Sequence, residues 1–267
     1  PLYRQKYLLC TPRPERCTAE FKIVEESDAK LIACYDVILN NDGVLTNYHQ
    51  ISEQDNALGK KWFVYVKYAE PSEWFNNQTY VDALSPTAIK EFIRITYEEY
   101  AKNVGEFFDK VIPAIFTDEP QVGKKGALSH AFAEEKVLLP WTTDFPVSFQ
   151  QTYGMDIIPA LPELIWETSA PSQIRYLYHD HVCERFTSAF PDQCGIWCRE
   201  HHIRLTGHMW MEETLDAQTA SVGEMMRTYR SCALPGIDML CDNVALATVK
   251  QAQSAAHQNG AEGVMSE

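Results

Sequence analysis

The 267-residue sequence contains no apolar run approaching the roughly 18 residues of a membrane-spanning helix, and no basic-then-apolar leader opens it. It also lacks an excess of positive charge, because 23 Lys and Arg oppose 37 Asp and Glu, for a formal net charge of -14. Nucleic acids and anionic membranes need clustered basic residues, so neither is expected as a partner. A glycine-rich phosphate turn is also missing, which argues against a dinucleotide-binding sheet.

Cysteine is sparse as well. Eight cysteines in so long a chain are too few for a disulfide scaffold, so free thiols are expected. Cys194, Cys198 and His201 fall on one face of a predicted helix, and their spacing permits a metal site. Burial of the cysteines as small apolar side chains is the competing interpretation, because no second ligand pair is apparent.

The two ends of the chain are unusual. Residue 1 is Pro rather than Met, and the chain stops at Glu267 directly after the apolar run Gly263-Val264-Met265-Ser266. We therefore expect a piece of a longer polypeptide, truncated at both ends.

The apolar content is high enough for one large core. Apolar residues make up 45% and aromatic residues 12% of the sequence, and a barrel of about 250 residues forms a single domain. Residues 19–23 and 30–39 are predicted to be strands, and the turn signal Asn40-Asn41-Asp42-Gly43 follows them. The opening of the chain is therefore predicted to be a small antiparallel excursion.

From Trp62 onward, apolar strands alternate with helices. The strands are expected at 62–68, 111–116, 203–209, 236–240 and 263–265. The helices are expected from Ser85-Pro86 to Gly105 and at 173–189, 193–201, 221–229 and 245–259. Such alternation is typical of a parallel sheet covered by helices.

Polar and aromatic residues follow the ends of these strands, at 70–74, 118–119, 208–213, 238–243 and 266–267. Active sites of β/α barrels lie at that face. The predicted fold is an incomplete (β/α)8 TIM barrel with about five of the eight βα strands readable. Residues 1–61 would form an N-terminal segment with a β insertion, and residues 62–267 a partial catalytic barrel.

Asp118 and Glu119 end one of these strands. Desolvation at the mouth of an apolar core raises the pKa of a carboxyl group, which suits a general acid near neutral pH. An acidic loop paired with Lys124 or Lys125 is the competing interpretation.

The segment 205–213 provides a second set of polar groups. It contains His208, Trp210 and the pair Glu212-Glu213, and Gly207 would allow a close approach of the backbone. A hydrogen-bonded core histidine and a packing tryptophan are the alternative. Glu267 ends the last strand and carries little weight by itself.

Several short runs, correctly ordered, resemble the catalytic barrel of the family-106 α-L-rhamnosidases and their uncharacterised bacterial relatives. The similarity runs from about Leu2 to the end of the chain. It is carried by the runs Tyr80-Val81-Asp82-Ala83-Leu84-Ser85-Pro86, Ile115-Phe116-Thr117-Asp118-Glu119-Pro120, Trp141-Thr142-Thr143-Asp144-Phe145, Thr206-Gly207-His208-Met209, Pro235-Gly236-Ile237-Asp238 and Val264-Met265-Ser266-Glu267.

The resemblance implies a larger glycosidase in which two carboxyl groups remove a terminal sugar from plant-type oligo- or polysaccharides, with inversion in the rhamnosidases. It assigns the acid to Glu119 and favours Glu267 as the base, with Glu213 as competitor. It also suggests a calcium ion near the sugar, without ligands assigned; nothing else in the sequence requires a cofactor. The substrate class implies a secreted or periplasmic protein.

Further residues are candidates for contacts with the sugar. The aromatic candidates, whose faces could pack on pyranose rings, are Trp74, Tyr80, Trp141 and Trp210. The candidates for binding sugar hydroxyls are Asp118, Asp144, His208 and Asp238. For each aromatic side chain, core packing is the competing role.

Two other functions compete with hydrolysis by two carboxyl groups. The first is a barrel that binds carbohydrate without cleaving it. The second is a metal-dependent hydrolase using His208, Asp118 and Glu213, although a His-x-His pair at the first readable strand is lacking.

Overall fold

The computed structural model describes residues 2–13, 29–123, 125–239 and 245–267, so the strand predicted at 19–23 lies outside the described residues. The chain divides into two compact units. Apart from the first two residues, the first unit is Tyr3–Tyr80 with Lys124–His181, and the second is Val81–Gly123 with Val182–Glu267. The last crossing between the units falls within helix α5 (Gln173–Ala189).

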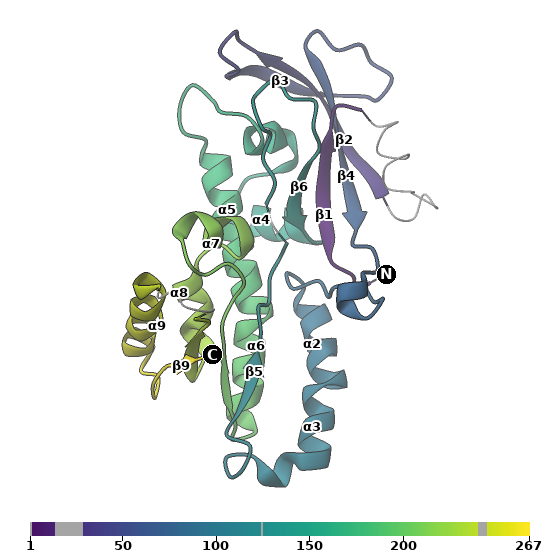
Figure 1. Cartoon of the computed structure of the whole chain (residues 1–267). Coiled ribbons are helices and arrows are strands. Elements are labelled where there is room, and N and C mark those ends of the chain that lie inside the picture. The colour runs from purple at the N-terminus through teal and green to yellow at the C-terminus, as the bar shows by residue number, and fades with distance from the viewer. Residues whose placement is uncertain (1, 14–28, 124, 240–244) are drawn as a thin grey trace. The chain divides into compact units, whose positions relative to one another are not determined.

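The first unit is built on an antiparallel sheet of five strands in the order β3-β2-β4-β1-β6 (Figure 1). The strands are β1 (Lys6–Thr11), β2 (Ala29–Leu39), β3 (Leu45–Ile51), β4 (Lys60–Tyr68) and β6 (Val137–Trp141). The turn predicted at 40–43 is confirmed, because it joins β2 to β3 with Gly43 at φ 82°. The antiparallel part is thus much larger than the predicted excursion.

Strand β4 was predicted to be the first readable strand of the barrel, and this is wrong. It lies between β2 and β1 and pairs antiparallel with both, with Trp62 opposite Tyr35 and Phe63 opposite Thr11. A strand buried on both faces has the same continuous apolar pattern in a parallel or an antiparallel sheet. The pattern at 62–68 therefore could not reveal the direction of its neighbours.

The remainder of the first unit is mostly short helices. They are η2 (Glu73–Phe75), α4 (Phe145–Tyr153), η4 (Ile158–Leu164) and the first part of α5. In the core, Trp62 and Trp166 meet edge to face with ring centroids 4.7 Å apart. Asp36, also buried, accepts hydrogen bonds from the backbone N–H groups of Leu58 and Gly59, both at 2.8 Å, and so fixes the loop before β4.

The second unit contains a parallel sheet of four strands in the order β5-β7-β8-β9. The strands are β5 (Ala114–Thr117), β7 (Arg204–Gly207), β8 (Leu234–Ile237) and β9 (Met265–Ser266). Each overlaps a predicted strand. The predicted barrel is nevertheless wrong: within the described ranges this sheet is open, with β5 and β9 at its edges, and the other sheet is antiparallel.

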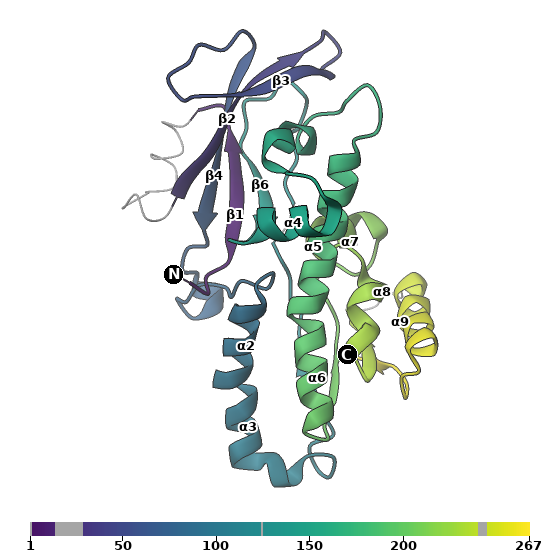
Figure 2. The ribbon, with the colours of Figure 1, turned by 180° about the vertical axis from the view of Figure 1, so that it is seen from behind.

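Helices of the second unit precede or follow these strands. They are α2 (Pro86–Ile95), α3 (Tyr97–Val104), η3 (Gly105–Phe107), α6 (Pro191–Glu200), α7 (Leu215–Ser221), α8 (Met225–Thr228), η5 (Tyr229–Ser231) and α9 (Leu246–Asn259). Helix α2 begins as predicted, with the Ser85 hydroxyl accepting a hydrogen bond from Ala88 N. Helix α9 lies beside α8, as both views show (Figures 1 and 2). Among the described residues, no helix has the length and apolar character needed to cross a bilayer.

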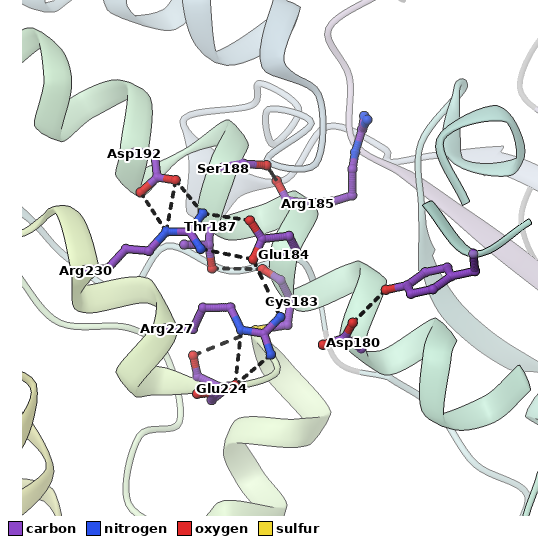
Figure 3. Close-up of polar contacts among 11 residues, drawn as sticks. Asp180, Cys183, Glu184, Arg185, Thr187, Ser188, Asp192, Glu224, Arg227 and Arg230 are labelled. Atoms are coloured by element: carbon purple, nitrogen blue, oxygen red, sulfur yellow. Dashed lines mark hydrogen bonds and ion pairs between the residues drawn. The ribbon is translucent and has the colours of Figure 1, made fainter. Parts of the chain in front are cut away.

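A cluster of ion pairs joins α5, α6 and the segment before β8 (Figure 3). The guanidinium of Arg230 lies 2.7 Å from an oxygen of Glu184 on α5 and 2.6 Å from one of Asp192 on α6. Arg227 pairs with Glu224 at 2.9 Å. These side chains are partly exposed, so each pair is expected to stabilise the fold by at most about 1 kcal/mol. The pairs made by Arg230 connect the segment that precedes β8 to α5 and α6.

The cysteines in the described ranges behave as apolar side chains. Cys10, Cys34, Cys183, Cys194, Cys198 and Cys232 are all buried and free, as predicted. Burial raises the pKa of the Cys10 and Cys232 thiols to about 12. These groups therefore stay protonated at neutral pH and are poor nucleophiles.

Candidate functional site

Polar side chains follow all four strands of the parallel sheet. Asp118 and Glu119 come after β5, His208 after β7, Asp238 after β8 and Glu267 after β9. Because the carboxyl ends of neighbouring parallel strands meet at one edge of a sheet, these groups gather there. The structure therefore brings together the site residues predicted from this half of the sequence.

His208 is the buried centre of the group. Its side chain is almost fully buried, and Nε2 lies 2.9 Å from a carboxylate oxygen of Glu267 and 3.4 Å from one of Asp118. The backbone N–H of His208 donates to the carbonyl of Thr117, 3.2 Å away. With Nε2 protonated, the imidazole donates to the carboxylate of Glu267 and orients it.

Glu119 adopts an unusual backbone conformation, with φ at 45°. A non-glycine residue in this left-handed region costs of order 1 kcal/mol or more, and such strain is concentrated at functional sites. Pro120 follows directly and is buried. The carboxyl group is thus set by a strained turn at the end of β5.

The electrostatic surroundings of Glu119 favour its protonated form. Desolvation by the surrounding protein is the main reason that the pKa of this carboxyl lies above its ordinary value, although the residue is solvent-accessible, and the charge of Asp118 adds to it. Asp238 and Glu213 act in the same direction, whereas His208 opposes them. A carboxyl group that keeps its proton to higher pH can act as a general acid.

A cavity of about 60 Å³ opens beside these groups. It is lined by Glu119, His208, Met209, Met211, Glu212, Glu213, Asp238 and Ala245. The carboxyl groups of Glu119 and Glu213 therefore share one cavity, and Glu267 reaches the same histidine from the edge strand β9. Trp210 is half-buried in the same segment.

Glu212 is the residue that sequence reasoning missed. It is only 4% exposed, and its carboxyl group contacts the backbone N of Asp238 at 2.8 Å and the hydroxyl of Tyr229 at 3.1 Å. The sequence predicts its neighbour Glu213, which is exposed, as the candidate base. A buried position for Glu212 depends on Tyr229 and Asp238, which the local pattern could not connect to it.

Gly207 makes the close approach that the sequence predicted. Its φ is 132°, and a Cβ at this position would lie 1.9 Å from the carbonyl oxygen of Thr117. We expect Gly207→Ala to push β7 away from β5 and lower the free energy of unfolding by more than about 2 kcal/mol, as overpacked or strained substitutions do. Urea denaturation measures this, with Gly154→Ala as control, since that glycine also has a positive φ but open space around it. Equal losses in the two variants would contradict the steric explanation.

Four predicted sugar contacts belong to the first unit. Trp141 lies in its core, 2% exposed and stacked on Phe145 at 4.5 Å, which matches the packing alternative. Trp74 is 87% exposed, and Tyr80 is half-buried against Phe75. Asp144 is exposed at the start of α4. Their roles as sugar contacts stay predictions.

The side chains around His208 could also serve as ligands for a cation. One donor atom each from Asp118, His208 and Glu267 lie within 4.8 Å of one another. Calcium takes six to eight oxygen ligands, whereas this set offers an imidazole nitrogen and two carboxylates, so it does not by itself fit calcium. The calcium suggested by the resemblance stays a prediction, and no chemical step is assigned to it.

The spacing of Cys194, Cys198 and His201 does not produce a metal site. Among the described residues, the donor atoms of these three side chains are not gathered closely enough to hold one ion. Burial raises the pKa of the Cys194 and Cys198 thiols to about 12. The ring of His201 instead stacks on Trp197, with centroids 3.8 Å apart. The apolar alternative is the better description of these cysteines.

Comparison with solved structures finds a similarity to part of a glycosidase. No protein-family model matches the chain, and no curated protein matches it. Among solved structures, a rhamnosidase from Novosphingobium sp. PP1Y is similar, with a TM-score of 0.58 and 20% sequence identity over 86% of this chain. The chain spans 21% of the length of that protein. The likeness shows a fold shared with part of a rhamnosidase; it does not show membership of family 106.

Proposed function

We propose that the protein is a glycoside hydrolase that removes a terminal sugar from plant-type oligo- or polysaccharides, with an activity like that of the α-L-rhamnosidases. The observation that carries the proposal is the placement of Glu119. Its carboxyl group is held by a strained backbone, has a raised pKa and shares a cavity with other carboxyl groups. The fold shared with part of a rhamnosidase supports the same class of reaction.

In the proposed reaction, Glu119 donates its proton to the glycosidic oxygen as the bond to the sugar breaks. Glu267, deprotonated and oriented by its hydrogen bond with His208, removes a proton from the water that attacks the sugar from the opposite face. Glu213, in the same cavity as Glu119, is the competing base. Carboxyl groups about 6.5–9.5 Å apart would give inversion, and about 5–5.5 Å would give retention through a covalent intermediate.

The remaining roles follow from this assignment. Asp118, His208 and Asp238 would bind sugar hydroxyls, and Trp210, half-buried in the same segment as His208, is the aromatic candidate for a further sugar contact. We propose a secreted or periplasmic protein, because oligosaccharides of plant origin are met outside the cytoplasm. Further domains of the same polypeptide would complete the enzyme.

The direct test is to incubate the full-length protein with a panel of terminal glycosides, including α-L-rhamnosides, and to detect free sugar. Release of one sugar supports the proposal. Binding of a sugar, measured by calorimetry, without release of product would replace it with a carbohydrate-binding function.

A metal-dependent hydrolase is the second candidate function. It is favoured by the proximity of donor atoms from Asp118, His208 and Glu267, because one imidazole with two carboxylates suits a transition-metal ion better than calcium. This function predicts that a chelator abolishes hydrolysis and that zinc, but not calcium, restores it. Activity that survives dialysis against chelator would exclude it.

A further inference from the structure

The mechanism proposed above leaves the buried carboxyl group of Glu212 without a role. Glu212 lies between β7 and α7 and is 4% exposed, yet no basic side chain forms an ion pair with it among the described contacts. Its carboxyl group instead contacts two groups, the backbone N of Asp238 and the hydroxyl of Tyr229. A buried carboxylate without a cationic partner is costly, so the protonation state of Glu212 needs an explanation.

Counting hydrogens gives that explanation. The hydroxyl of Tyr229 lies 2.6 Å from the carbonyl oxygen of Gly236 and 3.1 Å from Oε2 of Glu212. A tyrosine hydroxyl has one hydrogen, and a carbonyl oxygen has none. The contact at 2.6 Å therefore takes the hydrogen of Tyr229, and the contact at 3.1 Å lacks one unless Glu212 supplies it.

We infer that Glu212 is a protonated carboxylic acid in the folded protein and acts as a neutral positioning residue for the candidate site. Its Oε2–H donates to the hydroxyl of Tyr229, which in turn donates to the carbonyl of Gly236. Its Oε1 accepts the backbone N–H of Asp238, 2.8 Å away. All three contacts are satisfied, and no charge is buried.

The groups around Glu212 agree with this state. Three other carboxyl groups, those of Glu119, Glu213 and Asp238, line the same cavity, and His208 lines it too. Burial is the largest effect and raises the pKa of Glu212, and the negative charge of Asp238 adds to it. The N–H of Asp238 and His208 act against it, as would a hydrogen donated by Tyr229. From α7, the neutral amide of Gln218 donates to the backbone carbonyl of Glu212 at 2.8 Å.

This arrangement fixes the end of β8. Because Oε1 of Glu212 holds the backbone N–H of Asp238, it sets where the Asp238 carboxyl lies relative to Glu119, whose pKa Asp238 raises. The consequence for catalysis rests on the proposed function, but the protonation state of Glu212 does not. The proposed function and the protonation state of Glu212 can therefore be refuted independently of each other.

The test is the pH dependence of stability of the full-length protein and of Glu212→Gln, in which the new amide can donate to Tyr229 and accept from Asp238. If Glu212 is protonated, its pKa is higher in the folded than in the unfolded state. Its stabilising effect is then present at low pH and lost as the pH rises through the folded pKa. The urea midpoint of Glu212→Gln should equal or exceed that of the parent at neutral pH, and Glu212→Ala, which loses both contacts, should have a lower midpoint.

A Glu212→Gln variant that is less stable than the parent at neutral pH, with a difference that grows as the pH rises, would overturn the inference, as would a variant that fails to fold. Infrared difference spectra of parent and variant give an independent reading. The carbonyl band of a protonated carboxylic acid should disappear in Glu212→Gln, whereas loss of a carboxylate band would mean that Glu212 is ionised. Glu213→Gln, which changes an exposed carboxyl of the same segment, is the spectroscopic control. None of these readings depends on sugar hydrolysis.

Discussion

Glu119→Gln in the full-length protein is expected to lower kcat/KM for an unactivated terminal glycoside by about 10²–10⁴-fold, the usual contribution of a general acid. Glutamine keeps the size of the side chain but has no acidic proton for the departing oxygen. The loss should fall mainly on kcat, because the proton is transferred only as the bond breaks. Initial rates over a range of substrate concentrations measure it.

Two controls separate this effect from general damage. With the same variant, kcat/KM for an aryl glycoside should fall much less, because the phenol of that substrate leaves without being protonated. Glu106→Gln, an identical change at an exposed position in η3, should keep the activity of the parent. Near-parental turnover of Glu119→Gln on the unactivated glycoside would remove Glu119 from the mechanism.

The pH dependence of the parent's activity should show the ionisation of Glu119. Because the pKa of Glu119 is raised, it stays protonated above the ordinary range of a glutamate, and activity should decline as the pH rises through that raised value. In Glu119→Gln this alkaline decline should disappear from the residual activity, and a decline that persists unchanged would mean that another group causes it.

Glu267→Gln is expected to have the second large effect, again about 10²–10⁴-fold in kcat/KM, because the attacking water loses its base. The loss should persist on aryl glycosides with good leaving groups, in contrast to Glu119→Gln. The reason is that activating the water does not depend on the leaving group. The same kinetic measurements on both substrate classes distinguish an acid from a base.

Glu213→Gln is the matched comparison for Glu267→Gln, since Glu213 is an exposed carboxyl lining the cavity with Glu119. It should cost much less activity, because the carboxylate hydrogen-bonded to His208 is that of Glu267. The opposite order of the two losses would make Glu213 the base.

The parallel strands and the polar groups after them could be predicted from the sequence because both depend on local patterns. Strands β5, β7, β8 and β9 are short apolar runs, and Asp118, Glu119 and His208 follow two of them directly. Since parallel strands end at one edge of a sheet, the pattern also predicted that these groups meet.

The barrel could not be predicted correctly because closure of a sheet is not a local property. The apolar run of β4 fits a buried strand in either type of sheet, and it pairs with β1 and β2, of which β1 was not recognised. The role of Glu212 was missed for a related reason, because its burial depends on Tyr229 and Asp238. Contacts between distant segments decide both features.

The most direct test of the two-carboxyl mechanism is a crystal structure of the full-length protein with a thioglycoside analogue that resists hydrolysis. We expect the Glu119 carboxyl to lie within hydrogen-bonding reach of the glycosidic sulfur, and the Glu267 carboxyl to lie on the opposite face of the sugar with a water between it and the sugar. An analogue bound with Glu119 out of reach of the glycosidic atom would contradict it.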